Sequence, residues 1–404
     1  MRDFFELNVS DLKSLMTTHG EKEYNAKQIV SWVYEKGVLD WDAMSNLSKD
    51  LRAKLPSFIK LKTLELIRVQ ESEDLQTYKF LWKLHEGTFV ESVLICSGDR
   101  RTVCVSSQVG CPAKCAFCAS GKEGFVRNLR PAEIVEQVVQ INAWVGLNLK
   151  TAARDANLTQ PSEPQSHFDG VVLHHLGMSH PIKSDCSSES CANLASRTAV
   201  SRLKGERVSH VVYMGMGEPL KNYDSVVTSI RLLCDADFLN ISERRITLST
   251  VGIVEGIKRL SIEGLKVNLV LSLHAPNQHI RLKIIPYARK YPLEDILKAM
   301  DEYSHKTKRD ITFEYTLIAG INDHPDHAHE LAHLLHGKQC TVNLIPYNPV
   351  AGLRLKRPEK KAIKDFRTVL FGSRIVNTCR YTKGDDIAAA CGQLAMKEKS
   401  VSAT

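Results

Sequence analysis

The sequence predicts an α/β fold, a partial (βα)6 barrel preceded by a small helical domain and a β-hairpin. Three observations support this prediction. After residue 101, six short runs rich in Val, Ile and Leu alternate with amphipathic helical segments. Residues 11–56 carry helical periodicity, and residues 67–96 carry the alternation of β-strands. Apolar strands separated by helices are typical of a parallel sheet, and the absence of a nucleotide-binding fingerprint favours a barrel over a flat sheet.

The first 60 residues are expected to form a helical accessory domain. Its helices should begin near Asp11, Ala26 and Leu47, where apolar residues recur at helical spacing. A β-hairpin should follow, because Gln76–Leu84 alternates between polar and apolar residues and Thr88–Ile95 is largely apolar. We therefore divide the chain into residues 1–60, a hairpin linker at 61–100, a core at 101–395 and a tail at 396–404.

The core should contain six strand–helix steps. The expected strands are Thr102–Ser107, His210–Met214, Arg245–Thr250, Lys266–Leu273, Ile311–Ile318 and Thr341–Tyr347. The expected helices are Pro131–Trp144, Tyr223–Cys234, Ile253–Ile262, Leu293–His305, Pro325–Leu335 and Glu359–Leu370. Residues 149–206 interrupt the pattern, since they are rich in Ser, Asn, Gln and His without a sustained period, and we expect a partly disordered surface insertion.

Composition limits the class of protein. The 404 residues carry a net charge of +8, which suits a polyanionic partner but is weak evidence alone. No run of about eighteen apolar residues occurs, and the N-terminus lacks a signal or transit pattern, so we expect a cytoplasmic protein without a membrane anchor. Eleven cysteines, an odd number, fit reduced thiols better than a disulfide framework.

The most informative motif is a Cys-x3-Cys-x2-Cys triplet formed by Cys111, Cys115 and Cys118. Three thiolates at this spacing can hold three irons of a [4Fe–4S] cluster and leave the fourth iron open for a ligand. Structural zinc normally takes four protein ligands in two separated pairs, which the triplet does not resemble. Three buried free thiols are the remaining alternative. In the insertion, Cys186 and Cys191 could bind a metal, but incidental thiols in a mobile loop are the favoured interpretation.

Several polar or glycine-rich turns follow the predicted strands, where parallel α/β folds carry their chemistry. These turns contain Gly217, Glu218, Ser249, Ser272, Leu273, His274 and Asn348. A dinucleotide site at Gly217 is excluded, because Pro219 follows and a third glycine is missing. Glu218 could accept hydrogen bonds from a charged amino group, although a tight turn with a solvated glutamate remains an alternative.

Two further motifs have competing interpretations. His329 and His333 match the HExxH pattern of zinc proteases, which makes a zinc hydrolase the rival function. Against it, neighbouring histidines fall on several helix faces and no third ligand follows. Cys391 lies in a glycine-flanked turn and Cys104 in the first core strand, where each is either a reactive thiol or a small buried residue.

Taken together, these motifs resemble the radical S-adenosylmethionine (SAM) RNA methyltransferases that methylate adenine carbons, the RlmN/Cfr family. The resemblance covers nearly the whole chain except residues 149–206, which are much shorter in that family. Residues 27–37 resemble its accessory domain. The matching segments in the core are Cys104–Cys118, Gly124–Arg130, Met214–Leu220, Leu248–Gly252, Leu271–Ala275, Ile345–Pro349 and Lys383–Leu394.

The resemblance implies a role for each motif residue. Cys391 would carry the methyl group, Cys104 would resolve a covalent protein–RNA intermediate by forming a disulfide, and Glu91 would transfer a proton. The implied cluster ligands are Cys111, Cys115 and Cys118. The implied SAM contacts are Gly217, Glu218, Ser249, Ser272, Leu273, His274 and Asn348. The cofactors would be one [4Fe–4S] cluster per chain and SAM.

The implied reaction is methylation of C2 of adenosine in 23S rRNA, and in tRNA as well. The alternatives are C8 methylation of the same RNA, a radical enzyme acting on a small molecule, and the zinc hydrolase. Adenine must leave its stack to react, so a loop or an unfolded precursor is the expected target. A flavodoxin or ferredoxin would supply electrons, and we expect a monomer. Recurrent Arg and Lys residues near the predicted strand ends, including Arg127, Arg130 and Arg244, would face RNA phosphates, although ordinary solvated surface charge is the alternative for at least half of this set.

Overall fold

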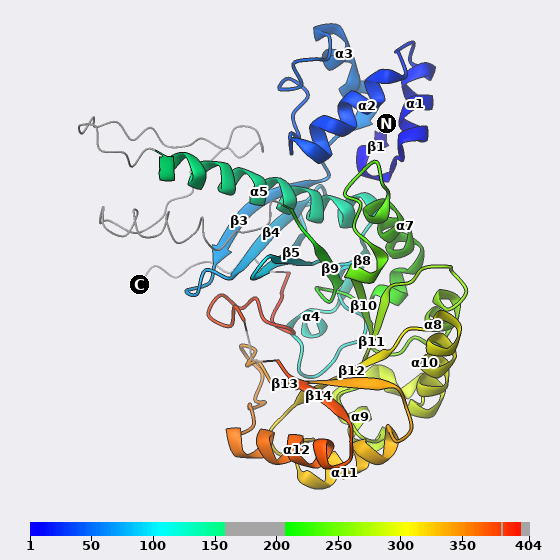
Figure 1. The fold of residues 1–404 in the computed structure, drawn as a ribbon, viewed down its shortest axis with the longest axis vertical. Coiled ribbons are helices and arrows are strands. Elements are labelled where there is room, and N and C mark those ends of the chain that lie inside the picture. The colour runs from blue at the N-terminus through cyan, green and yellow to red at the C-terminus, as the bar shows by residue number, and fades with distance from the viewer. Residues whose placement is uncertain (158–206, 381–382, 397–404) are drawn as a thin grey trace, which may run out of the picture.

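A ten-stranded sheet forms the centre of the computed structural model, which describes residues 1–157, 207–380 and 383–396 (Figure 1). The strand order is β14-β13-β12-β11-β10-β9-β6-β5-β4-β3. Neighbouring strands from β6 to β14 pair in parallel: β6 (Arg100–Cys104), β9 (His210–Tyr213), β10 (Ile246–Thr250), β11 (Asn268–Ser272), β12 (Ile311–Leu317), β13 (Cys340–Pro346) and β14 (Val376–Cys379). The six predicted core strands all form, and β14 is an additional edge strand.

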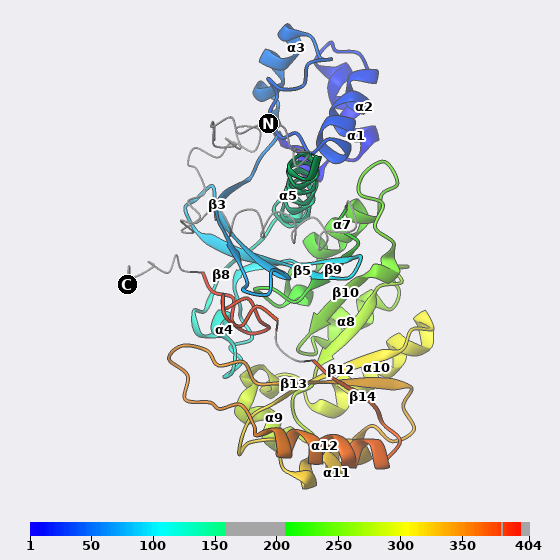
Figure 2. The ribbon, with the colours of Figure 1, turned by 60° about the vertical axis from the view of Figure 1, so that its left-hand side comes forward.

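Helices cover the outer side of this curved sheet (Figures 1 and 2). They are α5 (Pro131–Asn157), α7 (Tyr223–Cys234), α8 (Val254–Leu260), α10 (Leu293–Thr307), α11 (Pro325–Leu334) and α12 (Lys360–Gly372). Helix α10 illustrates why they form, because its buried residues Leu293, Ile296, Leu297 and Met300 recur at the spacing of one helix face. The predicted α/β barrel is confirmed as an open, partial barrel.

The inner side of the sheet carries shorter segments. Helix α4 (Ala119–Lys122) and the C-terminal residues 383–396 lie there side by side, and the Ala119 amide donates to the Gly392 carbonyl at 2.7 Å (Figures 1 and 2). Helix α9 (Gln278–Ile284) follows β11 and was not predicted. The concave side of the barrel therefore brings residues near 119 and 392 into contact.

The N-terminal helices are α1 (Val9–Thr18), α2 (Tyr24–Val30) and α3 (Lys49–Lys54), and α2 continues as the π-helical turn η2 (Ser31–Glu35). Asn8 and Asp11 form a capping box that fixes the start of α1. Strands β1 (Arg2–Asp3) and β2 (Ile59–Lys60) pair in parallel and close this module. Tyr34 stacks on Phe238 of the core with ring centroids 4.6 Å apart, so the module packs against the barrel.

The β-rich segment after the N-terminal module contains three antiparallel strands: β3 (Leu64–Glu71), β4 (Thr77–Leu84) and β5 (Phe89–Ser97). The sequence predicted two of them. Strand β5 also pairs with β6, so this segment extends the central sheet. Glu136 of α5 fixes the start of β3, because the Glu136 carboxylate accepts hydrogen bonds from the Thr63 and Leu64 amides.

The predicted insertion is described only at its start. Helix α5 extends to Asn157, so the chain is still helical where the insertion was expected to begin. Cys186 and Cys191 lie outside the described residues, as does most of the tail. Among the helices that the structure does describe, none is long and apolar enough to cross a membrane.

Candidate active site

The cysteine triplet lies on the loop between β7 (Gln108–Gly110) and β8 (Phe125–Asn128). Gly110 permits the tight entry into this loop, because it has φ +74° and an added Cβ would lie 1.9 Å from the Gly124 carbonyl oxygen. The Cys111 amide donates to that carbonyl at 2.7 Å, and the Ala116 amide donates to the Ile284 carbonyl at 2.8 Å. The loop is therefore fixed at its entry and at its centre.

The three thiols influence one another electrostatically. Burial raises the pKa of Cys111, and Cys118 and Glu218 raise it further. Burial also raises the pKa of Cys115, with Cys111 and Cys118 adding to the effect. Each thiol therefore holds its proton in the metal-free protein, and a bound cationic centre would be needed to stabilise the thiolates.

This donor set fits an iron–sulfur cluster better than a single metal ion. Across residues 1–157, 207–380 and 383–396, no three Cys, His, Asp or Glu side chains gather as they would around one ion. A four-iron cluster binds each cysteine at a different iron, so its ligands need not converge on one point. The three thiols on one rigid loop suit such a cluster.

Glu218 is buried, which excludes the solvated-turn interpretation. Its carboxylate accepts hydrogen bonds from the Val251 amide and the Thr250 hydroxyl, both at 2.8 Å. The preceding Gly217 has φ +112°, and an added Cβ would lie 2.7 Å from the Ser107 hydroxyl oxygen. Burial raises the pKa of Glu218 to about 7, in spite of these hydrogen bonds. A carboxylate held in this way is suited to accept hydrogen bonds from an ammonium group.

The turns after β10 and β11 meet at two serines, since the hydroxyl oxygens of Ser249 and Ser272 lie 3.1 Å apart. The amides of Leu273 and His274 both donate to the Glu314 carbonyl at 3.0 Å, so Leu273 contributes its backbone to the turn. His274 has φ +54°, and its Nδ1 accepts from the Thr316 amide at 2.9 Å. Burial lowers the pKa of His274 to about 3, so the ring is neutral.

The structure brings Cys391 next to the cysteine triplet although 273 residues separate it from Cys118. Gly392 and Leu394 accept hydrogen bonds from Ala119 and Ser120, which follow Cys118 directly. Asn348 donates to the Cys391 carbonyl at 3.1 Å. Cys391 therefore lies in a loop that is held against both the triplet and the end of β13.

Cys104 acts electrostatically on Cys391. The surrounding protein raises the pKa of the Cys391 thiol, and Glu314, Cys118 and Cys104 raise it further, although the residue remains exposed. Burial likewise raises the pKa of Cys104, to about 12. All nine cysteines in the described ranges are free thiols, so the disulfide implied for Cys104 and Cys391 is not formed in this structure.

Glu91 lies under the C-terminal segment. Its carboxylate pairs with the Lys79 ammonium at 3.2 Å and accepts from the Ala395 amide at 2.9 Å. Lys79 also donates to the Ala388 carbonyl at 3.3 Å. Both charges are buried, so Lys79 and Glu91 hold the chain on either side of Cys391.

The zinc-hydrolase alternative is not supported. His329 and His333 are exposed on α11, and the Glu330 carboxylate between them accepts a hydrogen bond from Asn277. These residues do not form a ligand group with other described side chains. The HExxH pattern here is a solvated helix face.

The sequence analysis missed two buried charges near the site. Glu314 interrupts the apolar strand β12 and acts electrostatically on Cys104 and Cys391. Arg281 lies on α9 and is fully buried. A single carboxylate within an apolar strand was a detectable signal for Glu314. The groups that Arg281 contacts belong to turns that are far apart in the sequence, so no local pattern indicated its role.

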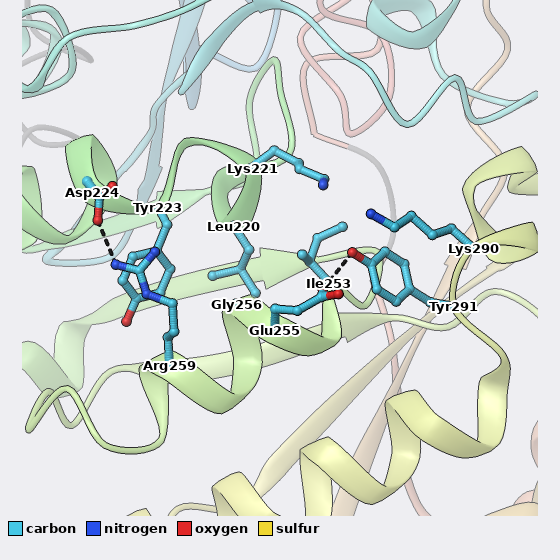
Figure 3. A pocket seen from close by; sticks show the side chains of 10 residues that line it. All are labelled: Leu220, Lys221, Tyr223, Asp224, Ile253, Glu255, Gly256, Arg259, Lys290 and Tyr291. Carbon is cyan, nitrogen blue, oxygen red and sulfur yellow. Dashed lines mark hydrogen bonds and ion pairs between the residues drawn. The ribbon is translucent and has the colours of Figure 1, made fainter.

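A separate pocket of about 310 Å³ opens beside the loop that follows Glu218 (Figure 3). Lys221 and Lys290 approach it from opposite sides, while Glu255 accepts from the Tyr291 hydroxyl at 2.6 Å. Arg259 pairs with Asp224 at the other end. None of the predicted site residues lines this pocket, so it is distinct from the cysteine site.

Comparisons with known proteins agree with this geometry. The model described as "Ribosomal RNA large subunit methyltransferase N-terminal domain" matches residues 2–61, and the "Radical SAM superfamily" model matches residues 197–332. The probable dual-specificity RNA methyltransferase RlmN 2 of Protochlamydia amoebophila is 65% identical and covers 98% of this chain and 95% of its own. The dual-specificity RNA methyltransferase RlmN of Marinobacter nauticus is 40% identical and covers 95% of this chain and 89% of its own.

A solved structure extends the similarity to the fold. The crystal structure of a radical SAM methyltransferase from Sphaerobacter thermophilus superposes with a TM-score of 0.80, at 36% identity, over 98% of this chain and 100% of its own. The match includes the partial barrel and the N-terminal module. On these similarities, the chain belongs to the RlmN family of radical SAM RNA methyltransferases.

Proposed function

We propose that this protein methylates C2 of adenosine in 23S rRNA and in tRNA, through a methyl group carried on Cys391. One observation carries the proposal: the Cys391 loop is hydrogen-bonded to the loop of the cysteine triplet and lies within electrostatic reach of Cys104. A methyl carrier needs access to both a methyl donor and a resolving thiol. The names of the similar proteins support RNA as the substrate.

The residues of the site would hold two cofactors. Cys111, Cys115 and Cys118 would bind a [4Fe–4S] cluster, and buried Glu218 would accept from the amino group of SAM. The remaining SAM contacts would come from Gly217, Ser249, Ser272, Leu273, His274 and Asn348. When bound, these cofactors supply the methyl group and the radical chemistry that adenine C2 requires, because this electron-poor carbon does not attack a methyl sulfonium as a nucleophile.

The protein's own thiols and carboxylates would complete the reaction. The Cys391 sulfur would give up its proton and take the methyl group. Once the radical chemistry that the bound cofactors supply has removed one hydrogen atom from this methyl group, its carbon would bond to adenine C2, and the adduct would lose one electron. Glu91 would accept the C2 proton. Cys104 would then lose its proton and attack the Cys391 sulfur as a thiolate, which breaks the bond between this sulfur and the RNA-bound carbon and leaves a Cys104–Cys391 disulfide. The released carbon would keep the electron pair of the broken bond and take up a proton, which completes the methyl group on adenine C2. A reductant must restore both thiols before the next turnover.

The rest of the chain would bind RNA and position the base. The N-terminal domain, residues 1–60, would serve as an RNA-binding accessory domain, joined through residues 61–100 to the catalytic core at 101–395. An adenine in a loop, or one unstacked from its neighbours, would enter the concave side of the barrel. We expect the enzyme to act as a monomer in the cytoplasm, with a flavodoxin or ferredoxin as the electron donor.

Mass spectrometry of nucleosides tests the proposal. Unmodified 23S rRNA and tRNA would be incubated anaerobically with cluster-loaded protein, reductant and SAM. We expect 2-methyladenosine from the unaltered protein and none from Cys391→Ala. Cys340→Ala is the matched control, because this half-buried thiol lies in β13 and no site interaction involves it. 8-Methyladenosine, or full methylation by Cys391→Ala, would contradict the proposal.

A further inference from the structure

Arg281 is a buried guanidinium held by the turns that surround the active site. The residue is fully buried and lies in the middle of α9, three residues before its end at Ile284. Its Nη2 donates to the carbonyls of Val251 (2.7 Å) and Ser272 (3.2 Å), and its Nε donates to the Leu273 carbonyl at 3.2 Å. All three acceptors belong to the strand-end turns after β10 and β11. Burial of a charge in this way is costly unless the charge has a use or a partner.

One nitrogen of this guanidinium has no acceptor. Among the described residues, Nη1 of Arg281 is buried without a hydrogen-bond partner. Such a group loses its hydration without compensation, so it is rare in a folded protein and points to a missing acceptor. The other two nitrogens already fix the side chain. A purely structural role therefore leaves Nη1 unexplained.

The two acidic groups that act electrostatically on this charge are both site residues. Val251 donates its amide to Glu218 and accepts from Arg281 through its carbonyl, so the carboxylate and the guanidinium bind the same residue. Ile284, one turn after Arg281 on α9, accepts from Ala116, the neighbour of Cys115. In agreement, the charges of Cys115 and Glu218 both act on Arg281. Arg281 thus lies between the cysteine loop and the Glu218 turn.

We propose that Arg281 is a cofactor-binding residue, whose Nη1 donates a hydrogen bond to an anionic acceptor between Cys115 and Glu218. The acceptor is either the Cys115 thiolate with its cluster or the carboxylate of SAM. The identity of both cofactors rests on the proposed function. A positive charge next to a cluster favours its reduction, because the reduced cluster carries one more negative charge. Next to the SAM carboxylate, the same charge would strengthen SAM binding instead.

Two measurements on the full chain with a reconstituted cluster distinguish these acceptors. One is an anaerobic redox titration followed by electron paramagnetic resonance without SAM, and the other is equilibrium binding of labelled SAM to the oxidised protein. If the cluster is the acceptor, Arg281→Met should lower the equilibrium constant for reduction about tenfold, which is about 59 mV for one electron. If the SAM carboxylate is the acceptor, the dissociation constant for SAM should rise about tenfold while the potential stays unchanged.

The controls separate binding from folding. Arg101→Met removes another fully buried arginine, one that donates to the Gly98 and Arg100 carbonyls at the start of β6, and it should change neither readout. Arg281→Lys keeps the charge but loses the guanidinium fork, so it should shift the same readout in the same direction by about threefold. If Arg281→Met fails to retain its cluster, the readout that shifts in Arg281→Lys identifies the acceptor.

Unchanged potential and unchanged SAM affinity in Arg281→Lys and Arg281→Met would overturn the inference. So would an equal shift in Arg101→Met, because the effect would then come from general destabilisation. Failure of the proposed function gives a different result: the Arg281 variants would still change the potential or the SAM affinity, but the protein would methylate another substrate. That result would leave the role of Arg281 intact.

Discussion

Replacement of Lys79 by Met is predicted to destabilise the protein and release the Cys391 loop. Lys79 on β4 and Glu91 on β5 form an ion pair with a 3.2 Å separation, and their side chains are only 6% and 5% exposed. The same two residues bond to Ala388 and Ala395, which lie on either side of Cys391. The substitution therefore removes a cation that stabilises a buried carboxylate and one anchor of the loop.

The expected magnitude follows from the burial of both charges. Breaking a buried pair by removing one partner costs about 3–5 kcal/mol, because the other charge stays buried without compensation. We expect this loss for Lys79→Met and a similar one for Glu91→Leu. The double variant removes both charges, so its main costs are the unsatisfied Ala395 amide and Ala388 carbonyl, about 1–3 kcal/mol each. Its loss should therefore be smaller than the sum of the single losses by about 3 kcal/mol or more.

Urea denaturation, followed by tryptophan fluorescence to which buried Trp82 on β4 contributes, measures these free energies. The rate at which a thiol reagent modifies Cys391 in native conditions measures release of the loop, and it should rise in Lys79→Met. Losses below about 1 kcal/mol for both single variants would refute the reasoning. Strictly additive losses would do so as well, because additivity means that the two charges do not interact.

Three further predictions concern Glu218, Glu136 and Gly110. Burial raises the pKa of Glu218 to about 7, and only the ionised carboxylate pairs with the ammonium group of SAM. The affinity for SAM, measured by equilibrium binding, should therefore fall up to tenfold per pH unit below about 7. Glu218→Gln should abolish this pH dependence. Burial raises the pKa of Glu136 to about 7 from 4.5, so the folded state binds more protons than the unfolded state between these values. Glu136 should therefore lower the free energy of unfolding by about 3 kcal/mol as the pH rises from 4.5 to 7, and a pH profile that is unaltered in Glu136→Gln would contradict this. Gly110→Ala should lower the iron and sulfide content per chain, because its Cβ would collide with Gly124, whereas Gly98→Ala, where no atom lies within 4 Å, should not.

The fold was predictable wherever burial leaves a strong local pattern. The core strands are buried on both faces, so they appear as continuous apolar runs. Strand β14 was missed because Val376–Cys379 is an edge strand of four residues, too short to show an alternating pattern, and two of the four are polar. Strand β3 was missed for a related reason, since most of its residues are only partly buried and its charged residues obscure the alternation.

The site was predictable only in part, because some of its residues are close together in the sequence and others are brought together only by the fold. The cysteine triplet is local, so its spacing alone indicated a cluster. The proximity of Cys391 to Cys118 depends on the path of the whole chain, and the sequence offered no spacing argument for it. Lys79 and Arg281 are harder still to predict. Lys79 bonds to the backbone of a distant segment as well as to Glu91, and the partners of Arg281 are backbone groups of separate turns. Buried charges of this kind become visible only when tertiary structure places them.

The most direct test of the central claim locates the methyl group on the protein before RNA is added. Cluster-loaded protein would be incubated anaerobically with reductant and SAM that carries a labelled methyl group, and then digested for peptide mass spectrometry. We predict one labelled methyl group on Cys391, none on Cys104, and transfer of the label to adenine C2 when RNA follows. Labelled RNA from a protein whose Cys391 never carries the label would contradict the carrier mechanism.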